Sequence, residues 1–393
     1  MGRALSLQDG GVIFHAGGGI EFPLHPMWLR ERIQNPADYD AGCRQRLYDP
    51  WRLPTDLRVV SVGPVDSAGV EVRFSDGWAG RFDLAVLARE IDPMLDPDTL
   101  PPRTPWMADD LVLTRASVAT LDTAFGLVGF LDGFLRTGVG LIQNDRAEAG
   151  TILSVARRFG PVRETNFGTL FEVRVEDNPV DLAYTPMALF AHTDNPYRKP
   201  IPGIQFLSCV RNDAQGGDST LVDGLAVTDV LRQVDPDAFE ALATTDIRYR
   251  YDGDGSVLED VGRMIEIDDA GAVRRIRFNP RVEFVVATTA ARLDVFYRAR
   301  AAFGALLGDG RFEVRFRLEA GDTLMFDNHR LLHGRTAFHA NGPRHLQGCY
   351  IEHDGPESLY RVTRASLDSS ASNQLAMRST TGVGKRSGSQ TSQ

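Results

Sequence analysis

Two histidines and one aspartate have the residue types and spacing of a metal site. His192 and Asp194 are separated by one residue, and His333 lies far along the chain. In an extended segment, residues i and i+2 point to the same side, so this imidazole and carboxylate would converge on one point. Two histidines and one carboxylate form the facial triad that holds Fe(II) while leaving coordination positions open. We therefore predict that His192, Asp194 and His333 are catalytic iron ligands.

An arginine that follows the second histidine suggests a cosubstrate. Arg344 follows His333 by eleven residues and directly precedes a predicted strand at residues 346–351. A guanidinium binds a carboxylate in a bidentate manner. A 2-oxo acid that chelates the metal through one end needs such a partner for the carboxylate at its other end.

The elements that must position these side chains are mostly strands. Alternating or buried apolar runs, bounded by turn residues, predict strands after residue 185. Helical periodicity predicts helices at residues 117–135 and 147–159, and two further helical segments interrupt the strands near residues 226–242 and 288–307. A turn at residues 268–271 predicts a hairpin between two of the strands. Many strands with few helices indicate a mainly β (α+β) fold with two packed sheets, a β-sandwich or jelly roll. The predicted strands that matter most below cover residues 204–210, 219–222, 323–326 and 346–351.

Composition shifts divide the chain into four parts. Residues 1–92 carry short alternating runs, among them residues 57–62 and 70–74 joined by a hairpin turn, which predict a small β-rich domain. Residues 93–106 are rich in proline and aspartate, a linker composition. We assign residues 107–365 to the catalytic domain. Residues 366–393 are rich in serine, threonine and glycine, and we expect them to be disordered.

The overall charge and the cysteines exclude several classes of function. The 393 residues carry a formal net charge of −10, which disfavours nucleic acid and anionic membranes as partners. We see no apolar run that reaches the roughly 18 residues of a membrane helix. Three widely spaced cysteines form neither a disulfide framework nor a zinc motif. We therefore expect a cytoplasmic protein.

The motifs around these residues resemble those of the γ-butyrobetaine hydroxylase and trimethyllysine dioxygenase family, which is part of the TauD-like superfamily. These are Fe(II)- and 2-oxoglutarate-dependent oxygenases with a double-stranded β-helix (jelly-roll) core. The matching segments are His192-Thr193-Asp194, Gly216-Gly217-Asp218-Ser219, the run from Asp327 to Arg335, the run from Arg344 to Tyr350, and Trp28-Leu29-Arg30 in the N-terminal domain.

The resemblance implies a reaction and its cofactors. His192, Asp194 and His333 would ligate iron, Arg344 would pair with the 5-carboxylate of 2-oxoglutarate, and Ser219 would lie near the same cosubstrate. The enzyme would hydroxylate a C–H bond with O₂ and release succinate and CO₂, as in carnitine biosynthesis, with ascorbate as an assay additive. The resemblance also implies a homodimer.

Four aromatic positions match the family's cage for a trimethylammonium group: Phe167, Phe171, Tyr184 and Tyr350. Aromatic faces attract such a cation through cation–π interactions. The resemblance therefore favours a small quaternary ammonium, betaine-like substrate. The alternative is that Phe167 and Phe171, four residues apart, form a core-facing pair on a helix.

The residues expected at the opposite end of the substrate do not specify a single chemical group there. Asn279 matches one of two asparagines that hold the substrate carboxylate in γ-butyrobetaine hydroxylases, whereas Asp181 stands at the other position. A carboxylate there favours a cationic or hydroxyl group, as in trimethyllysine. Arg281, two residues after Asn279, would instead suit a carboxylate or phosphonate. γ-Butyrobetaine, trimethyllysine and 2-trimethylaminoethylphosphonate all stay open as substrates.

The N-terminal domain departs from the family pattern. Family members hold zinc there with clustered cysteines, but here Cys43 stands alone. One thiol cannot replace the four ligands of a structural zinc. We predict that this domain lacks structural zinc.

Two other classes of function compete with an oxygenase. The first is a non-catalytic sensor of 2-oxoglutarate or a betaine, which would not need an open iron site. The second is a metal-dependent hydrolase or isomerase, which would not need Arg344. Dependence of turnover on 2-oxoglutarate and O₂ separates the three.

Overall fold

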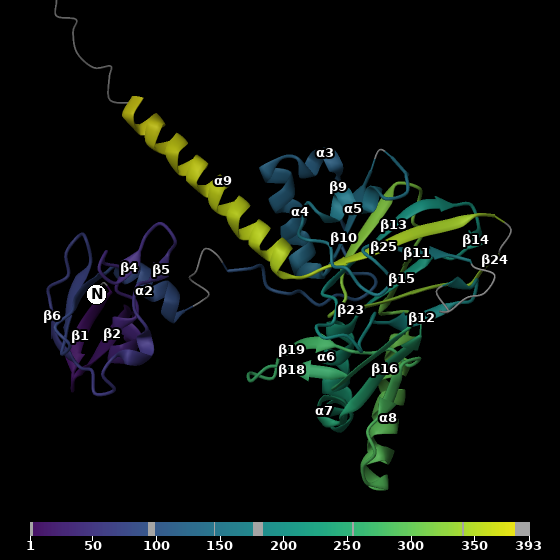
Figure 1. Cartoon of the computed structure of the whole chain (residues 1–393), viewed down its shortest axis with the longest axis horizontal. Coiled ribbons are helices and arrows are strands. Elements are labelled where there is room, and N and C mark those ends of the chain that lie inside the picture. The colour runs from purple at the N-terminus through teal and green to yellow at the C-terminus, as the bar shows by residue number, and fades with distance from the viewer. Residues whose placement is uncertain are drawn as a thin grey trace, which may run out of the picture. The chain divides into compact units, whose positions relative to one another are not determined.

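A computed structural model describes residues 3–92, 99–144, 146–175, 184–253, 255–339 and 342–381, with side chains up to residue 369. Asp181, one of the predicted substrate residues, lies outside these ranges. The chain divides into two compact units, Met1–Thr99 and Leu100–Gln393. Each unit is described separately (Figure 1).

The N-terminal unit contains two three-stranded antiparallel sheets. One has the order β1 (Ala4–Gln8), β2 (Gly11–Gly17), β3 (Ile20–Leu24), and the other β6 (Val59–Val62), β7 (Val70–Phe74), β8 (Ala79–Phe82). The predicted hairpin between β6 and β7 is confirmed. Its Gly69 has φ +110°, and an added Cβ would lie 2.2 Å from the carbonyl oxygen of Phe82. Helices α1 (Pro26–Arg30) and α2 (Leu84–Ile91) complete the unit.

A buried arginine organises the N-terminal unit. Arg30 is 2% exposed, and its guanidinium donates to Asp38 at 2.8 Å and Asp76 at 2.9 Å. The rings of Tyr48 and Trp78 lie 5.1 and 4.9 Å from the guanidinium carbon. The buried charge of Arg30 is therefore paired with two carboxylates and lies against two aromatic rings. These contacts offset the free-energy cost of burying the charge.

The larger unit begins before the predicted domain start. Residues 100–106, which we assigned to the linker, pack onto this unit. Trp106 is buried, and its backbone N–H donates to Asp223 Oδ2 at 3.0 Å. Asp223 forms a fully buried ion pair with Arg330 at 2.7 Å, and Arg330 also donates to the Thr104 carbonyl. The proline-rich composition reflects an extended conformation, but apolar burial and these hydrogen bonds hold the segment in place.

Two sheets form the core of the larger unit. The six-stranded sheet has the order β11 (Phe171–Arg174), β25 (Arg344–Ile351), β13 (Ile204–Asn212), β22 (Asp322–Asp327), β10 (Val139–Gln143), β9 (Thr114–Ser117). The four-stranded sheet has the order β12 (Leu189–His192), β23 (Leu331–Arg335), β15 (Ser219–Asp223), β21 (Glu313–Phe316). The strands predicted at residues 204–210, 219–222, 323–326 and 346–351 are confirmed as β13, β15, β22 and β25.

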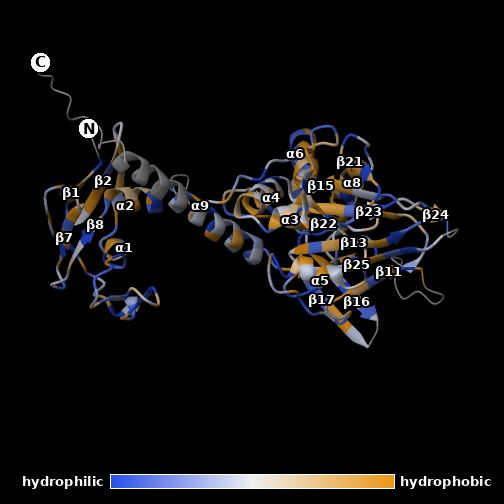
Figure 2. Cartoon of the chain, turned by 90° about the horizontal axis from the view of Figure 1, so that it is seen from above, coloured by the Kyte–Doolittle hydropathy of each residue, from blue (hydrophilic) through white to orange (hydrophobic). Residues whose placement is uncertain are grey.

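Apolar side chains explain why these strands pair as they do. Figure 2 shows hydrophobic residues along β13 and β22 in the middle of the larger sheet. Phe206, Leu324 and Phe326 are fully buried, as expected for central strands covered on both faces. The predicted fold class, a mainly β jelly roll with added helices, matches this arrangement.

Helices cover the core of the larger unit. The single helix predicted at residues 117–135 is two, α3 (Val118–Leu121) and α4 (Ala124–Thr137), because the Thr123 hydroxyl accepts from Gly126 N–H and starts a second helix. α5 (Thr151–Ala156) is shorter than its predicted range of residues 147–159.

A long insertion between β15 and β21 has its own core. It holds α6 (Gly224–Val234), α7 (Pro236–Thr244) and α8 (Ala290–Leu307) together with β16 (Ile247–Gly253), β17 (Ser256–Gly262) and β20 (Glu283–Val285). The hairpin of β18 (Ile265–Ile267) and β19 (Val273–Ile276) is confirmed. This insertion carries part of the cavity described below.

The C-terminal segment differs from expectation. Helix α9 spans Asp354–Thr381, so residues 366–381 are helical where we predicted disorder. Serine and threonine lower helix propensity only modestly, and the alanines and leucines between them support a helix. Residues 382–393 lie outside the described ranges. Within the described part of the chain, no helix is both long and apolar enough to cross a membrane.

Candidate active site

Strand pairing brings the two predicted histidines together. His192 ends β12, His333 is the central residue of β23, and the two face each other directly in the antiparallel register. Their ring centroids are 4.3 Å apart. The His192 Nδ1 atom is 2.8 Å from the Phe190 carbonyl oxygen, which directs Nε2 toward Asp194. The two sequence-distant histidines therefore share one site.

Asp194 completes a three-ligand cluster. Its Oδ1 lies 3.4 Å from His192 Nε2 and 3.7 Å from His333 Nε2, and the ligand atoms all lie within 4.8 Å of one another. An ion bonded to each at about 2.0–2.2 Å would fit among them. Neutral nitrogen and carboxylate oxygen with no thiolate suit Fe(II). The donor set and its spacing thus fit the predicted metal.

Electrostatics favour the protonation states that a metal requires. Burial would raise the pKa of Asp194, but His333, His192 and Tyr350 outweigh it and hold that pKa well below its usual range. Burial, with the neighbouring His192, lowers the pKa of His333 to about 3. At neutral pH the aspartate is therefore ionised and His333 is neutral, as metal ligation needs.

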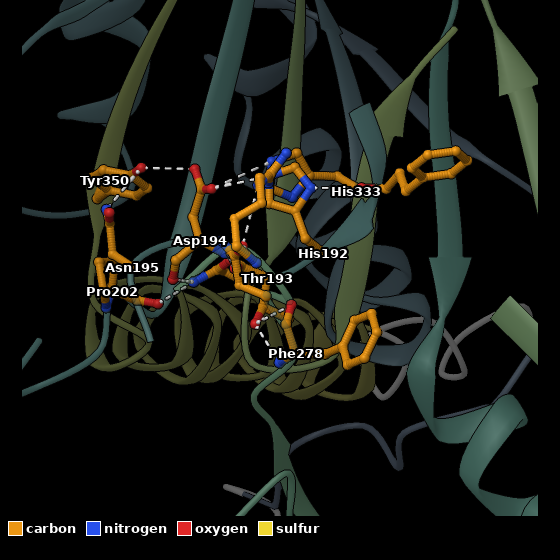
Figure 3. Close-up of polar contacts among 12 residues, drawn as sticks. His192, Thr193, Asp194, Asn195, Pro202, Phe278, His333 and Tyr350 are labelled. Atoms are coloured by element: carbon orange, nitrogen blue, oxygen red, sulfur yellow. Dashed lines mark hydrogen bonds and ion pairs between the residues drawn. The ribbon is translucent and has the colours of Figure 1, made fainter. Parts of the chain in front are cut away.

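Backbone hydrogen bonds fix the segment between the ligands (Figure 3). The Asn328 amide accepts from Asp194 N–H at 2.7 Å and donates to the Asp194 carbonyl at 3.1 Å. On the other side, Thr193 N–H donates to the Phe278 carbonyl, and Phe278 N–H donates to the Thr193 hydroxyl. The ligand-bearing backbone is thus held from both sides.

A cavity of about 480 Å³ opens beside the three ligands. Every predicted site residue within the described ranges lines it. Besides the metal cluster these are Phe167, Phe171, Tyr184, Ser219, Asn279, Arg281, Arg344 and Tyr350.

Arg344 brings a buried positive charge to this cavity without an ion-pair partner among the described residues. It is 7% exposed, and its guanidinium donates to the Gly217 carbonyl at 3.2 Å and lies over the ring of Phe338. Among the described residues no carboxylate pairs with it. Burial lowers its pKa, yet a guanidinium stays charged in proteins. A buried cation without an anion is costly, so this arrangement favours an anionic ligand. Ser219, also buried, lines the same cavity.

Aromatic rings line the cavity as well. Phe171 and Tyr350 lie with ring centroids 5.1 Å apart, and Phe167 makes an edge contact with Tyr251 at 5.7 Å. Phe171 begins β11, and Phe167 lies in the turn before it, so the alternative of a helical pair is wrong. Tyr251 stacks on Tyr197 at 5.2 Å.

Asn279, which we predicted to bind the polar end of the substrate, forms hydrogen bonds within the protein. Asn279 donates to the Thr193 carbonyl at 3.3 Å, and its Oδ1 accepts from Arg281 Nε at 3.2 Å. Asn279 therefore orients Arg281 and braces the ligand segment. Across the described ranges Arg281 forms no ion pair. The predicted role of Asp181 stays a prediction because that residue lies outside those ranges.

Sequence reasoning missed several cavity residues. Tyr197, Arg250, Tyr251 and Asp252 line it, and Asn195 lies directly after the metal carboxylate. The adjacency of Asn195 and Tyr197 to Asp194 was an available signal. No local pattern marks residues 250–252, because only the packing of the insertion brings β16 to the cavity.

Comparisons with known proteins place most of the chain in one family of enzymes. Residues 113–350, more than half of the chain, match the Taurine catabolism dioxygenase TauD, TfdA family. The gamma-butyrobetaine dioxygenase of Pseudomonas sp. (strain AK-1) is 32% identical over 367 residues, covering 92% of this chain and 95% of the relative. The mitochondrial trimethyllysine dioxygenase of Gallus gallus is 29% identical over 347 residues, covering 84% and 80%.

Solved structures give more distant matches. The PvcB protein from Pseudomonas aeruginosa has a TM-score of 0.44 at 22% identity, covering 59% of this chain and 81% of that one. An asparagine oxygenase in complex with Fe(II), 3-hydroxyasparagine and succinate has a TM-score of 0.46 at 17% identity, covering 60% and 82%.

The chain belongs to the TauD/TfdA family of dioxygenases. It is therefore an enzyme that acts with O₂ on a small molecule. Within this family its sequence is similar both to gamma-butyrobetaine dioxygenases and to trimethyllysine dioxygenases.

Proposed function

We propose that the protein is an Fe(II)- and 2-oxoglutarate-dependent dioxygenase that hydroxylates a C–H bond of a small quaternary ammonium substrate of the γ-butyrobetaine type. One observation carries the proposal. A single cavity joins the His192–Asp194–His333 cluster, the buried cation of Arg344 and a set of aromatic rings. These three parts correspond to metal, cosubstrate and substrate.

The chain's own residues have distinct tasks in this reaction. His192, Asp194 and His333 hold the metal and leave its remaining positions open. Fe(II), when bound there, would supply O₂ activation coupled to oxidative decarboxylation of 2-oxoglutarate to succinate and CO₂. Arg344 binds the far carboxylate of 2-oxoglutarate and orients its 2-oxo acid end toward the ligands, with Ser219 beside it. The protein therefore contributes mainly by positioning the metal and the cosubstrate, and less by acid–base catalysis.

The aromatic rings and Arg281 bind opposite ends of the substrate. Phe167, Phe171, Tyr184 and Tyr350 present apolar, electron-rich faces that suit a trimethylammonium group. Arg281, held by Asn279, offers a cation to an anionic group. A molecule with a cationic end and an anionic end is oriented by both, so the distance between these contacts selects the carbon that is attacked.

Two alternatives use the same chemistry. 2-Trimethylaminoethylphosphonate is favoured by Arg281, since a guanidinium also binds phosphonate oxygens in a bidentate manner. Trimethyllysine depends on Asp181 meeting an amino group. The more remote alternative is a non-catalytic sensor of 2-oxoglutarate or a betaine. The homodimer, the cytoplasmic location and the exclusion of nucleic acid and membrane partners stay predictions.

Succinate formation tests the proposal. Anaerobic, Fe(II)-loaded protein is mixed with 2-oxoglutarate and then with O₂, with or without each of the three candidate substrates. We expect succinate to rise with γ-butyrobetaine, and the product to gain one oxygen atom in its mass. The matched variant His333→Ala should lose this turnover together with iron binding. Full turnover without bound iron would contradict the ligand assignment, and bound iron without any succinate would favour the sensor.

A further inference from the structure

Three side chains link the cavity wall to the metal carboxylate by hydrogen bonds. The Tyr350 hydroxyl lies 2.9 Å from Asp194 Oδ2. The Asn195 amide Nδ2 donates to the Tyr350 hydroxyl at 3.0 Å, and the Tyr197 hydroxyl donates to Asn195 Oδ1 at 2.6 Å. All three residues are more than nine-tenths buried, and all three line the cavity. Figure 3 shows Asn195 and Tyr350 on the side of Asp194 away from the histidines.

We propose that Tyr350 and Asn195 are positioning residues that keep Asp194 a one-oxygen ligand of the metal. The inference rests on the proposed iron site and deepens it. Tyr350 thereby has a second role beyond the aromatic wall, and Asn195 gains a role that its sequence position alone did not assign.

The two oxygens of Asp194 have different surroundings. Oδ1 faces Nε2 of both histidines, at 3.4 and 3.7 Å, whereas Oδ2 accepts from Tyr350. A carboxylate can bind a metal through one or both oxygens. Because the hydroxyl occupies Oδ2, ligation through Oδ1 is favoured. Ligation through one oxygen of Asp194 and one nitrogen of each histidine would leave positions for the cosubstrate and O₂, and a second aspartate oxygen would take one of them.

The number of protons on each group determines the direction of each hydrogen bond. An amide NH₂ group can only donate, so the Tyr350 oxygen accepts from Asn195 and directs its single proton to Asp194. Tyr197 likewise has one proton, and Asn195 Oδ1 accepts it. Asn195 therefore sets the orientation of the Tyr350 hydroxyl, while Tyr197 sets the orientation of the Asn195 amide.

The backbone at Asn195 supports this placement. Its φ of +52° is in the left-handed region, which asparagine tolerates better than most residues. Asn195→Gly therefore removes the amide without adding backbone strain. Tyr350→Phe removes only the hydroxyl and keeps the ring against Phe171.

The chain offers a matched control. The Tyr360 hydroxyl donates to Asp132 Oδ1 at 3.2 Å, and Tyr360 does not line the cavity. Tyr360→Phe thus deletes the same kind of tyrosine–aspartate hydrogen bond elsewhere in the larger unit. Thermal melts of all variants check that each is folded.

Anaerobic Fe(II) titration and the visible charge-transfer absorption of the Fe(II)–2-oxoglutarate complex test the inference without turnover. We expect Tyr350→Phe and Asn195→Gly to bind Fe(II) roughly 10- to 100-fold more weakly, as for loss of groups that orient a metal ligand, and to shift the absorption band. Tyr360→Phe should match the wild type.

The outcomes separate this inference from the proposed function. Wild-type protein that binds no Fe(II) would overturn both. Normal Fe(II) affinity and an unshifted band in Tyr350→Phe would overturn the positioning role and leave the oxygenase intact. Weak binding by Tyr350→Phe with normal binding by Asn195→Gly would remove Asn195 from the proposal.

Discussion

At the scale of single residues, Arg344 makes a separable contribution to cosubstrate binding. We predict that Arg344→Gln raises the KM for 2-oxoglutarate roughly 10- to 100-fold, because a charge-assisted hydrogen bond contributes about 1.5–3 kcal/mol. The KM for the quaternary ammonium substrate should change little. Initial rates of succinate formation at varied 2-oxoglutarate measure this.

A conservative variant serves as the control for Arg344. Arg344→Lys keeps the charge but loses the bidentate geometry, so its KM for 2-oxoglutarate should lie between those of the wild type and Arg344→Gln. An unchanged KM for 2-oxoglutarate in Arg344→Gln would mean that the cosubstrate binds elsewhere.

A glycine on β25 determines where one aromatic ring lies. Gly348 faces Phe171 in the strand register, and an added Cβ would lie 2.2 Å from two Phe171 ring carbons. We predict that Gly348→Ala displaces this ring and raises the substrate KM about 10-fold, with little change in the KM for 2-oxoglutarate. Gly304→Ala on α8 is the matched control, since its Cβ would meet nothing within 4 Å. Equal effects on both KM values would indicate general disruption instead.

At the scale of elements, a histidine–aspartate pair joins the end of β22 to the start of α9. His353 Nε2 lies 2.8 Å from Asp327 Oδ1. Burial would lower the pKa of His353, but Asp327 outweighs it and raises that pKa above its usual value. Burial lowers the pKa of neighbouring His329 to about 3, so His329 stays neutral in the folded protein.

The raised pKa of His353 predicts a pH-dependent stability. A folded-state pKa above the unfolded value of about 6.5 stabilises the protein fully below that value, and the contribution is lost as pH rises through the folded pKa. His353→Gln should therefore lower the free energy of unfolding by about 2 kcal/mol at pH 6 and by less at pH 9. Urea denaturation at both pH values measures the difference. The exposed His339→Gln should show neither effect, and an equal loss at both pH values for His353→Gln would rule out the charged pair.

Prediction from sequence was most accurate for elements with strong local patterns. Strands such as β13 and β22 are apolar on both faces and were located correctly. The helix at residues 117–135 was not, because the Thr123 hydroxyl starts a second helix within an apolar stretch. The helical residues of α9 after position 366 were missed because their composition resembles that of disordered tails.

At the scale of the whole molecule, metal removal should affect the two units differently. A chelator should abolish turnover, and added Fe(II) should restore it. The N-terminal unit should unfold at the same temperature with or without chelator, because we predict that it holds no zinc and because the ion pairs of Arg30 with Asp38 and Asp76 stabilise it. Three of the four tryptophans, Trp28, Trp51 and Trp78, lie in this unit, so their fluorescence follows its unfolding.

Metal analysis completes this test. We expect no stoichiometric zinc in the purified protein, in agreement with the isolated Cys43. Chelator that lowers the tryptophan unfolding temperature, together with one equivalent of zinc, would contradict the prediction of a zinc-free N-terminal domain.

The sequence by itself was enough to predict the chemistry of the site. The types and spacing of His192, Asp194, His333 and Arg344 carried that prediction, because metal and carboxylate recognition depend on specific functional groups that few other residues supply. The family resemblance added the aromatic positions. The described structure brings these side chains to one cavity.

Only the tertiary structure decided how the site is held. Three contacts join residues that are far apart in the chain, and no sequence pattern predicts them. They link Tyr350 to Asp194, Asn328 to the backbone of Asp194, and Tyr251 to Tyr197. Side-chain direction in a packed core depends on every surrounding element at once, whereas sequence periodicity reports only the face on which a residue lies.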